Sequence, residues 1–158
     1  MNAINFLIKI KHERKLSAVE SSEEIKQSYM KKSESNLASA KILLENNKIG
    51  ETVSLAYYSA YNILLSLLFK NGIKSENHSA SIILLKEVFD LDNNIILSAK
   101  EERIKTQYYA DFNATKKQAI DLIQKVEEFN GILLDFISKL TNEKIDFYRN
   151  KFIKMIQF

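Results

Sequence analysis

The stretch EERIKTQYYADF, residues 101–112, holds the side chains in this sequence whose types and spacing are best suited to chemistry. Arg103 is one of three arginines in the chain, and a guanidinium is a natural partner for carboxylate and phosphate groups. Tyr108 and Tyr109 follow it by five and six residues. The alternative is an ordinary surface ion pair at the end of a helix with aromatic side chains to bury.

Two other stretches carry aromatic or titratable side chains. AYYSAY, residues 56–61, alternates small residues with tyrosines, which is typical of close helix packing with aromatic side chains filling the space beside it. His78 follows a corner between two helices and precedes an apolar helix. It is therefore either a cap or loop histidine, or a group that approaches Arg103 across the protein.

Most signatures of catalysis are absent from the sequence. Three isolated glycines cannot form a phosphate-binding loop, and a chain without cysteine has no thiol nucleophile. His12 and His78 are far apart and lack metal-ligand spacing, so we expect neither a metal site nor a cofactor. The adjacent glutamates at 101–102 and 127–128 point about 100° apart on a helix and do not form a carboxylate pair.

The composition favours an all-α protein of one domain, residues 1–158. Apolar residues make up 46% and charged residues 27% of the chain, with no proline and three glycines. We expect an up-and-down bundle of four to five main helices with its core at about 20–140, and a C-terminal helical extension at 141–158. The expected helices are 22–46, 51–71, 78–89, 93–109, 115–140 and 141–158. Residues 1–20 are the least regular part, with a short strand or a helical turn near their start.

These helix bounds are predicted from candidate capping residues and from the spacing of apolar residues. Ser21 with Glu24, and Thr115 with Gln118, have capping-box spacing. Thr141 is a candidate cap for the last helix, and Gly50 and Gly72 are candidate helix ends. Helix 51–71 should be the most buried, since only a thin polar stripe remains on it, formed by Ser59, Asn62 and Ser66.

The remaining expectations concern location and partners. The early apolar run INFLIKI is too short to span a membrane, so we expect a cytoplasmic protein with no membrane contact. A net charge of +3 allows nucleic acid as a partner without requiring it.

Three segments, taken in order, resemble the HEPN superfamily. They are LAYYSAYNILLSLLFKNGIKSENHS, RIKTQYY and KKQAIDLIQKVEEFNGILLDFI, and the similarity extends over about residues 20–140. The branch they resemble most is UPF0332, a group of small archaeal and bacterial proteins. The resemblance implies a helical bundle that pairs as a homodimer, beside a minimal nucleotidyltransferase in a toxin–antitoxin-type module.

Many HEPN proteins are metal-independent ribonucleases with Arg-x(4–6)-His, in which the arginine stabilises phosphate charge and the histidine transfers protons. This sequence departs from that pattern, because tyrosine stands where the histidine would be after Arg103. Tyrosine, with a pKa near 10, is a poor base at neutral pH. Only Arg103 and His78 remain as candidate catalytic residues, so an enzymatic role is open and not favoured.

Helix geometry refines the candidate ligand-binding set, which comprises Arg103, Gln107, Tyr108, His78 and Tyr58. Gln107, four residues on, is the true helical neighbour of Arg103, and together they can bind a phosphate or a nucleotide edge, or contact the second protomer. Tyr108 points about 140° away from Arg103, on the side of Ile104 and Leu97, which suggests that it lies in the core.

Three functions stay open at this point. The first is a nucleotide-, RNA- or partner-binding subunit working with a nucleotidyltransferase, which in related systems attaches AMP to a tyrosine near Tyr108 or Tyr109. The second is a ribonuclease toxin that uses Arg103 with His78. The third is a helical dimerisation or scaffold protein.

Overall fold

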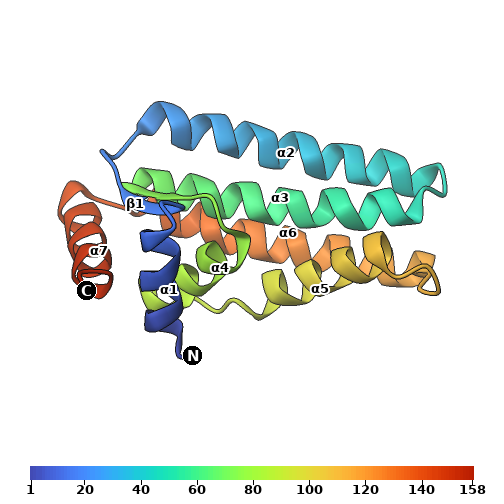
Figure 1. Cartoon of the computed structure of the whole chain (residues 1–158). Coiled ribbons are helices and arrows are strands. Elements are labelled where there is room, and N and C mark those ends of the chain that lie inside the picture. The colour runs from blue at the N-terminus through green and yellow to red at the C-terminus, as the bar shows by residue number, and fades with distance from the viewer.

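The computed structural model describes residues 1–158 and contains seven helices and one two-stranded sheet (Figure 1). The all-α prediction is confirmed. In chain order the elements are α1 (Ala3–His12), β1 (Leu16–Ala18), α2 (Glu23–Glu45), α3 (Ile49–Lys70), β2 (Ile73–Ser75), α4 (His78–Glu87), α5 (Asn94–Tyr108), α6 (Lys116–Ser138) and α7 (Asn142–Met155).

Four long helices, α2, α3, α5 and α6, run up and down side by side, and α3 lies in the middle of them (Figure 1). Helix α3 is buried along nearly its whole length, which confirms that it is the most buried helix. It is long and apolar enough to cross a membrane by composition, but 78% of its most apolar window is buried inside the protein. Its hydrophobicity is therefore accounted for by its place at the centre of the core.

In the polar stripe of α3, Ser59 and Ser66 are buried and Asn62 is partly buried. The Ser33 hydroxyl donates to the Ser59 carbonyl, and the Ser59 hydroxyl donates to the Ser33 carbonyl, both at 2.8 Å. The Asn130 side-chain amide of α6 donates to the Ser59 hydroxyl at 3.0 Å. Small hydroxyl side chains allow α2 and α3 to approach closely while their polar groups satisfy one another.

Helix α6 shows the clearest agreement between pattern and structure. The Thr115 hydroxyl and the Gln118 side chain form the predicted capping box. Apolar residues recur at three- and four-residue spacing from Ala119 to Leu140. The first five, Ala119, Leu122, Val126, Phe129 and Leu133, are buried, and the last two, Phe136 and Leu140, are partly buried.

Two predicted cap positions were wrong. Ser22, rather than Ser21, caps α2 by accepting from the Ile25 amide, while the Ser21 hydroxyl donates to the Lys70 carbonyl of α3. Gly50 lies inside α3, and Asn47 makes the preceding turn with a φ of 59°. Asparagine tolerates this left-handed conformation better than most residues, so a glycine was not required there.

Gly72 ends α3 as predicted, with a φ of 71°. A Cβ at this position would also lie only 2.6 Å from the Val19 carbonyl oxygen and from Nε of Arg149. Glycine is therefore required here for two reasons: the turn is left-handed, and three chain segments approach one another closely at this position.

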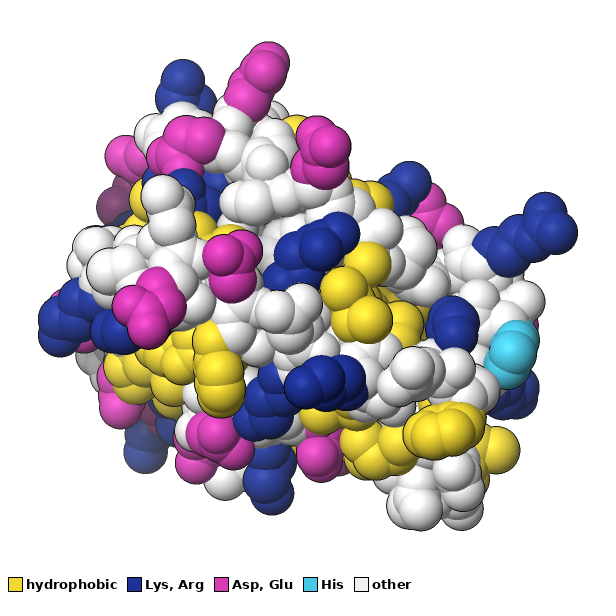
Figure 2. Space-filling model, turned by 90° about the vertical axis from the view of Figure 1, so that its left-hand side faces the viewer, with side chains coloured by type: hydrophobic (Ala, Val, Ile, Leu, Met, Phe, Trp, Pro, Cys, Tyr) yellow, Lys and Arg dark blue, Asp and Glu magenta, His cyan; other side chains and the backbone are white.

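Residues 1–20 are more regular than expected. They form helix α1 and strand β1, which pairs antiparallel with β2 so that Leu16 faces Ser75 and Ala18 faces Ile73. Leu7 of α1 and Phe152 of α7 belong to the same hydrophobic core as the main bundle. Figure 2 looks at the end of the molecule where α1 and α7 lie, and shows cationic and anionic side chains interspersed with hydrophobic ones.

Candidate functional site

An aromatic and cationic cluster lies where α3, α4 and α5 meet. Helix α3 supplies three tyrosines, α4 begins with His78, and α5 supplies Lys100, Arg103 and Gln107. Asn77 caps α4 through the Ala80 amide, which places His78 in the first turn of that helix. We refer to Tyr57, Tyr58, Tyr61, His78, Lys100, Arg103 and Gln107 as the α3–α5 cluster.

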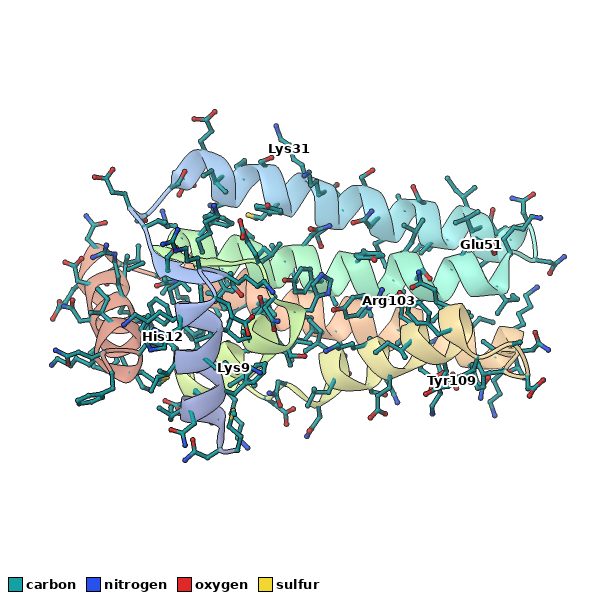
Figure 3. All side chains as sticks on the ribbon, in the orientation of Figure 1. Lys9, His12, Lys31, Glu51, Arg103 and Tyr109 are labelled. Atoms are coloured by element: carbon teal, nitrogen blue, oxygen red, sulfur yellow. The ribbon has the colours of Figure 1, made fainter.

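Arg103 lies on the side of α5 that faces α3 (Figure 3), and it contacts three other members of the cluster. Its guanidinium lies 4.9 Å from the centre of the Tyr57 ring and 5.5 Å from that of Tyr58, within the range of cation–π attraction. Nη1 donates to the Tyr58 hydroxyl at 3.3 Å and to Oε1 of Gln107 at 3.2 Å. Both hydrogen bonds of the guanidinium are made by Nη1, and the buried Nε has no partner, so the guanidinium is not saturated with hydrogen bonds.

His78 is held by the tyrosines of α3. Its ring stacks on Tyr61, with centroids 3.9 Å apart and planes 15° from parallel. Its Nδ1 lies 2.7 Å from the Tyr57 hydroxyl. Burial raises the pKa of Tyr57, so this hydroxyl stays protonated, and we assign it as the donor to Nδ1. Nε2 of His78 then carries the proton.

The surroundings of His78 favour its neutral form. Burial lowers the pKa of His78, and the positive charges of Arg103 and Lys100 lower it further. A neutral imidazole whose Nδ1 already accepts a hydrogen bond is a donor at Nε2, not a free base. The geometry brings His78 into the environment of Arg103, as the sequence suggested, and gives it a fixed orientation.

Tyr108 was wrongly expected in the core. It is 68% exposed, Leu97 on the same side of α5 is 42% exposed, and Tyr109 is 60% exposed. Tyr109 directly follows the last residue of α5 and lies at the edge of the molecule in Figure 3. Both tyrosines are therefore open to other molecules and do not belong to the α3–α5 cluster.

The sequence-based set missed three members of the cluster, Tyr57, Tyr61 and Lys100. The apolar seam of α3 predicts Tyr57 as core, and it is fully buried, yet its hydroxyl reaches His78. Lys100 looks like a surface lysine, but three residues before Arg103 it lies on nearly the same face of a helix. That spacing was the signal that could have found it.

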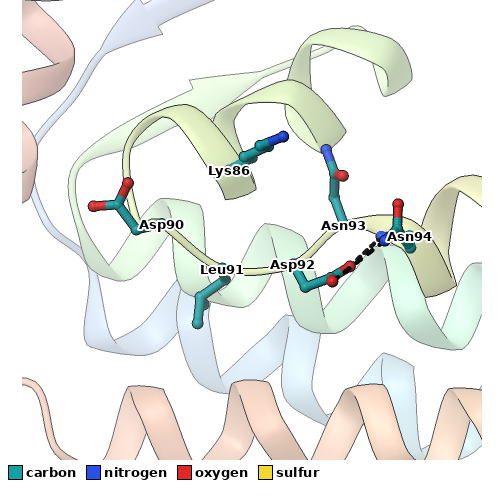
Figure 4. A pocket seen from close by; sticks show the side chains of 6 residues that line it. All are labelled: Lys86, Asp90, Leu91, Asp92, Asn93 and Asn94. Atoms are coloured by element: carbon teal, nitrogen blue, oxygen red, sulfur yellow. Dashed lines mark hydrogen bonds between the residues drawn. The ribbon is translucent and has the colours of Figure 1, made fainter.

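A polar hollow away from the α3–α5 cluster has a structural explanation. It lies in the loop between α4 and α5, has a volume of about 300 Å³, and is lined by Lys86, Asp90, Leu91, Asp92, Asn93 and Asn94 (Figure 4). The Asp92 carboxylate accepts from the Asn94 backbone amide and its side chain, and Asp90 pairs with Lys151 at 3.4 Å. These carboxylates stabilise the start of α5 and the packing of α7.

The order of the helices, the tyrosine-rich α3 and the arginine of α5 can now be compared with known proteins. The model of the HEPN domain matches residues 27–141. The chain belongs to the HEPN domain family. The matched region runs from early α2 to just past the end of α6. Every residue of the α3–α5 cluster therefore lies within the HEPN domain.

Two relatives are archaeal. The UPF0332 protein PH1297 of Pyrococcus horikoshii is 41% identical over 54 residues, which cover 34% of this chain and 38% of that protein. The protein named "Putative toxin MJ0605" from Methanocaldococcus jannaschii is 29% identical over 117 residues, which cover 70% of this chain and 84% of that protein. The UPF0332 resemblance read from the sequence is thus confirmed.

The neutral His78 of this HEPN domain makes its stability depend on pH. The pKa of His78 lies below the ordinary value of about 6.5, so the unfolded chain binds a proton more readily than the folded protein. This stability is fully present above about pH 6.5 and is lost as the pH falls through the lower folded value. We expect the melting temperature to drop on acidification from pH 7, and to drop less in His78→Gln. The matched control is His12→Gln, at the exposed histidine of α1; an identical pH profile for all three proteins would contradict this expectation.

Proposed function

We propose that this HEPN-domain protein binds phosphate groups of RNA or of nucleotides at Arg103, and that it does so without cutting RNA. The observation that carries the proposal is the unused hydrogen-bonding capacity of Arg103. Its guanidinium is held by Tyr57, Tyr58 and Gln107, and makes no salt bridge with any carboxylate. A partly buried, oriented arginine without a counter-ion is suited to a phosphate oxygen.

The aromatic surroundings support a nucleotide ligand in particular. Tyr58 is only partly buried, and its hydroxyl accepts from Arg103 while keeping its own proton free to donate. Aromatic side chains beside a cation are the usual combination for single-stranded nucleic acid, in which bases stack and phosphates pair with positive charge.

His78 supports binding over cleavage. General acid–base cleavage of RNA needs a group that exchanges protons near neutral pH. In this site burial and two nearby cations lower the pKa of the histidine, and Nδ1 is already occupied by Tyr57. The ribonuclease alternative remains a candidate because Arg103 and His78 both contact Tyr57.

We place the protein in a toxin-type module, on the basis of the HEPN domain and the relative named as a toxin. In this proposal it forms a homodimer and pairs with a minimal nucleotidyltransferase. The exposed Tyr108 and Tyr109, at the C-terminal end of α5, are then the accessible acceptors for AMP. A tyrosine in the core could not serve, so their exposure favours this role over the one that periodicity predicted.

The test is binding and integrity of RNA in the same experiment. Fluorescently labelled single-stranded and hairpin RNAs are titrated with purified protein in the presence of a metal chelator, and anisotropy and gel mobility are measured. We expect saturable binding that weakens with added salt, with intact RNA after prolonged incubation. Metal-independent cleavage that is lost in Arg103→Ala would establish the ribonuclease alternative. If neither RNA nor nucleotides bind at millimolar concentration, the scaffold alternative replaces the proposal.

A further inference from the structure

A second cation, Lys100, lies one helical turn before Arg103 on α5 and reaches in a different direction. Its Nζ donates to the Ser79 hydroxyl at 2.6 Å, in the first turn of α4. Arg103 instead reaches toward Tyr58 and Gln107, so the two charges are spread over different elements. The cluster therefore presents two positive centres, each fixed by its own polar partner.

No carboxylate balances these charges. Neither Lys100 nor Arg103 takes part in any of the seven salt bridges of the protein. Burial lowers the pKa of Lys100, and the positive charge of Arg103 lowers it further. Two partly buried like charges without a counter-ion repel each other, and anions bound at both positions would relieve that repulsion.

The first turn of α4 adds donors at the same place. The Ser79 hydroxyl accepts from Lys100 and keeps its own proton to donate, and the N-terminal end of a helix carries partial positive charge, although Asn77 already binds the Ala80 amide. His78, with its proton assigned to Nε2, precedes Ser79 in the chain and is influenced by both cations. A single phosphate at Arg103 would leave these donors unused.

We propose that Lys100 and Ser79 form a second phosphate subsite beside Arg103, so that the preferred ligand carries two consecutive phosphate groups. This inference rests on the proposed function, because it assigns one phosphate to Arg103. Two sources share the chemistry: a nucleoside diphosphate, and two neighbouring phosphates of a 5′-phosphorylated RNA.

The decisive experiment compares ligands with one and two phosphates. Isothermal titration calorimetry is carried out with AMP and ADP, and with the dinucleotides ApA and pApA, which carry one and two phosphates. The proteins are the wild type, Lys100→Gln, Ser79→Ala and Arg103→Ala, with Lys105→Gln as the matched control on the exposed side of α5. Melting temperatures identify any variant that fails to fold.

In the wild type we expect the two-phosphate ligand of at least one pair to bind about tenfold more tightly than its one-phosphate counterpart. Lys100→Gln should reduce this preference to less than about twofold while leaving AMP and ApA affinities nearly unchanged, since it removes only the second charge–charge contact. Ser79→Ala should reduce the preference in the same direction, and Arg103→Ala should weaken all ligands. Lys105→Gln should behave as the wild type.

The outcomes separate the two proposals. If the wild type binds none of these ligands and none of the labelled RNAs, the proposed function fails and this inference fails with it. If it binds the labelled RNAs but none of these four ligands, the second subsite is wrong while the proposed function stands. The second subsite is wrong, while phosphate binding at Arg103 stands, in either of two cases. In the first, the wild type binds AMP as tightly as ADP, and ApA as tightly as pApA. In the second, Lys100→Gln weakens both members of a pair by the same factor. A preference for ADP alone indicates a free nucleotide, and one for pApA alone indicates an RNA end.

Discussion

Replacing Arg103 with alanine is expected to weaken RNA and nucleotide binding by about 10- to 100-fold. A hydrogen bond to a charged group contributes about 1.5–3 kcal/mol, and the substitution removes the charge and its donors together. Arg103 is centred among Tyr57, Tyr58 and Gln107, which orient it for a ligand and cannot replace it. Fluorescence anisotropy with labelled RNA, at fixed salt concentration, measures the effect.

Two controls show whether the guanidinium itself is responsible. Arg103→Lys keeps the charge but loses the planar fork, so we expect it to recover only part of the affinity. Lys105→Ala removes one positive charge from the exposed side of the same helix, and we expect less than about a threefold effect from this change. Equal losses in Arg103→Ala and Lys105→Ala would mean that net charge, and not this site, attracts the ligand.

Replacing Phe129 with alanine should lower the free energy of unfolding by about 3–5 kcal/mol. Phe129 is among the largest fully buried side chains, on the face of α6 that packs into the common core. Removing its ring leaves a cavity that neighbouring helices cannot fill without shifting. Urea or guanidinium denaturation followed by circular dichroism gives the difference.

The matched control for this substitution is Ile132→Ala, on the same helix. Ile132 is 48% exposed, so its loss should change the free energy of unfolding by about 0.5 kcal/mol or less. If both variants lose similar stability, the orientation of α6 in the bundle is wrong. The contrast therefore tests the fold independently of any ligand.

Short-range patterns in the sequence were sufficient to predict much of the fold. The three- and four-residue spacing on α6 predicted which of its side chains are buried, because an apolar stripe must face the core in water. Thr115, Thr141 and Gly72 marked helix ends, since caps and left-handed turns depend on a few neighbouring residues. Gln107 was correctly identified as the neighbour of Arg103, because both lie on one helix.

The same short-range patterns failed to predict burial at positions where it depends on how the helices pack against one another. Tyr108 shares the periodicity of a buried position, but Tyr108 and Leu97 on the same side of α5 are both exposed, because no other element covers them there. Ser59 has the pattern of a solvent-facing residue, yet it is buried because α2 supplies complementary serine groups. Periodicity says which residues share a face, and only the packing says whether that face is covered.

The sequence by itself determined an all-α chain and its main helices, and it named Arg103 as the candidate site residue. The tertiary structure alone decided that His78 stacks on Tyr61 beneath the Tyr57 hydroxyl, and that Lys100 extends the cluster toward Ser79. The physical reason is the separation along the chain over which each interaction acts. Helix formation and capping act over four residues, whereas these contacts join residues about 20 positions apart that meet only after α3, α4 and α5 have packed together.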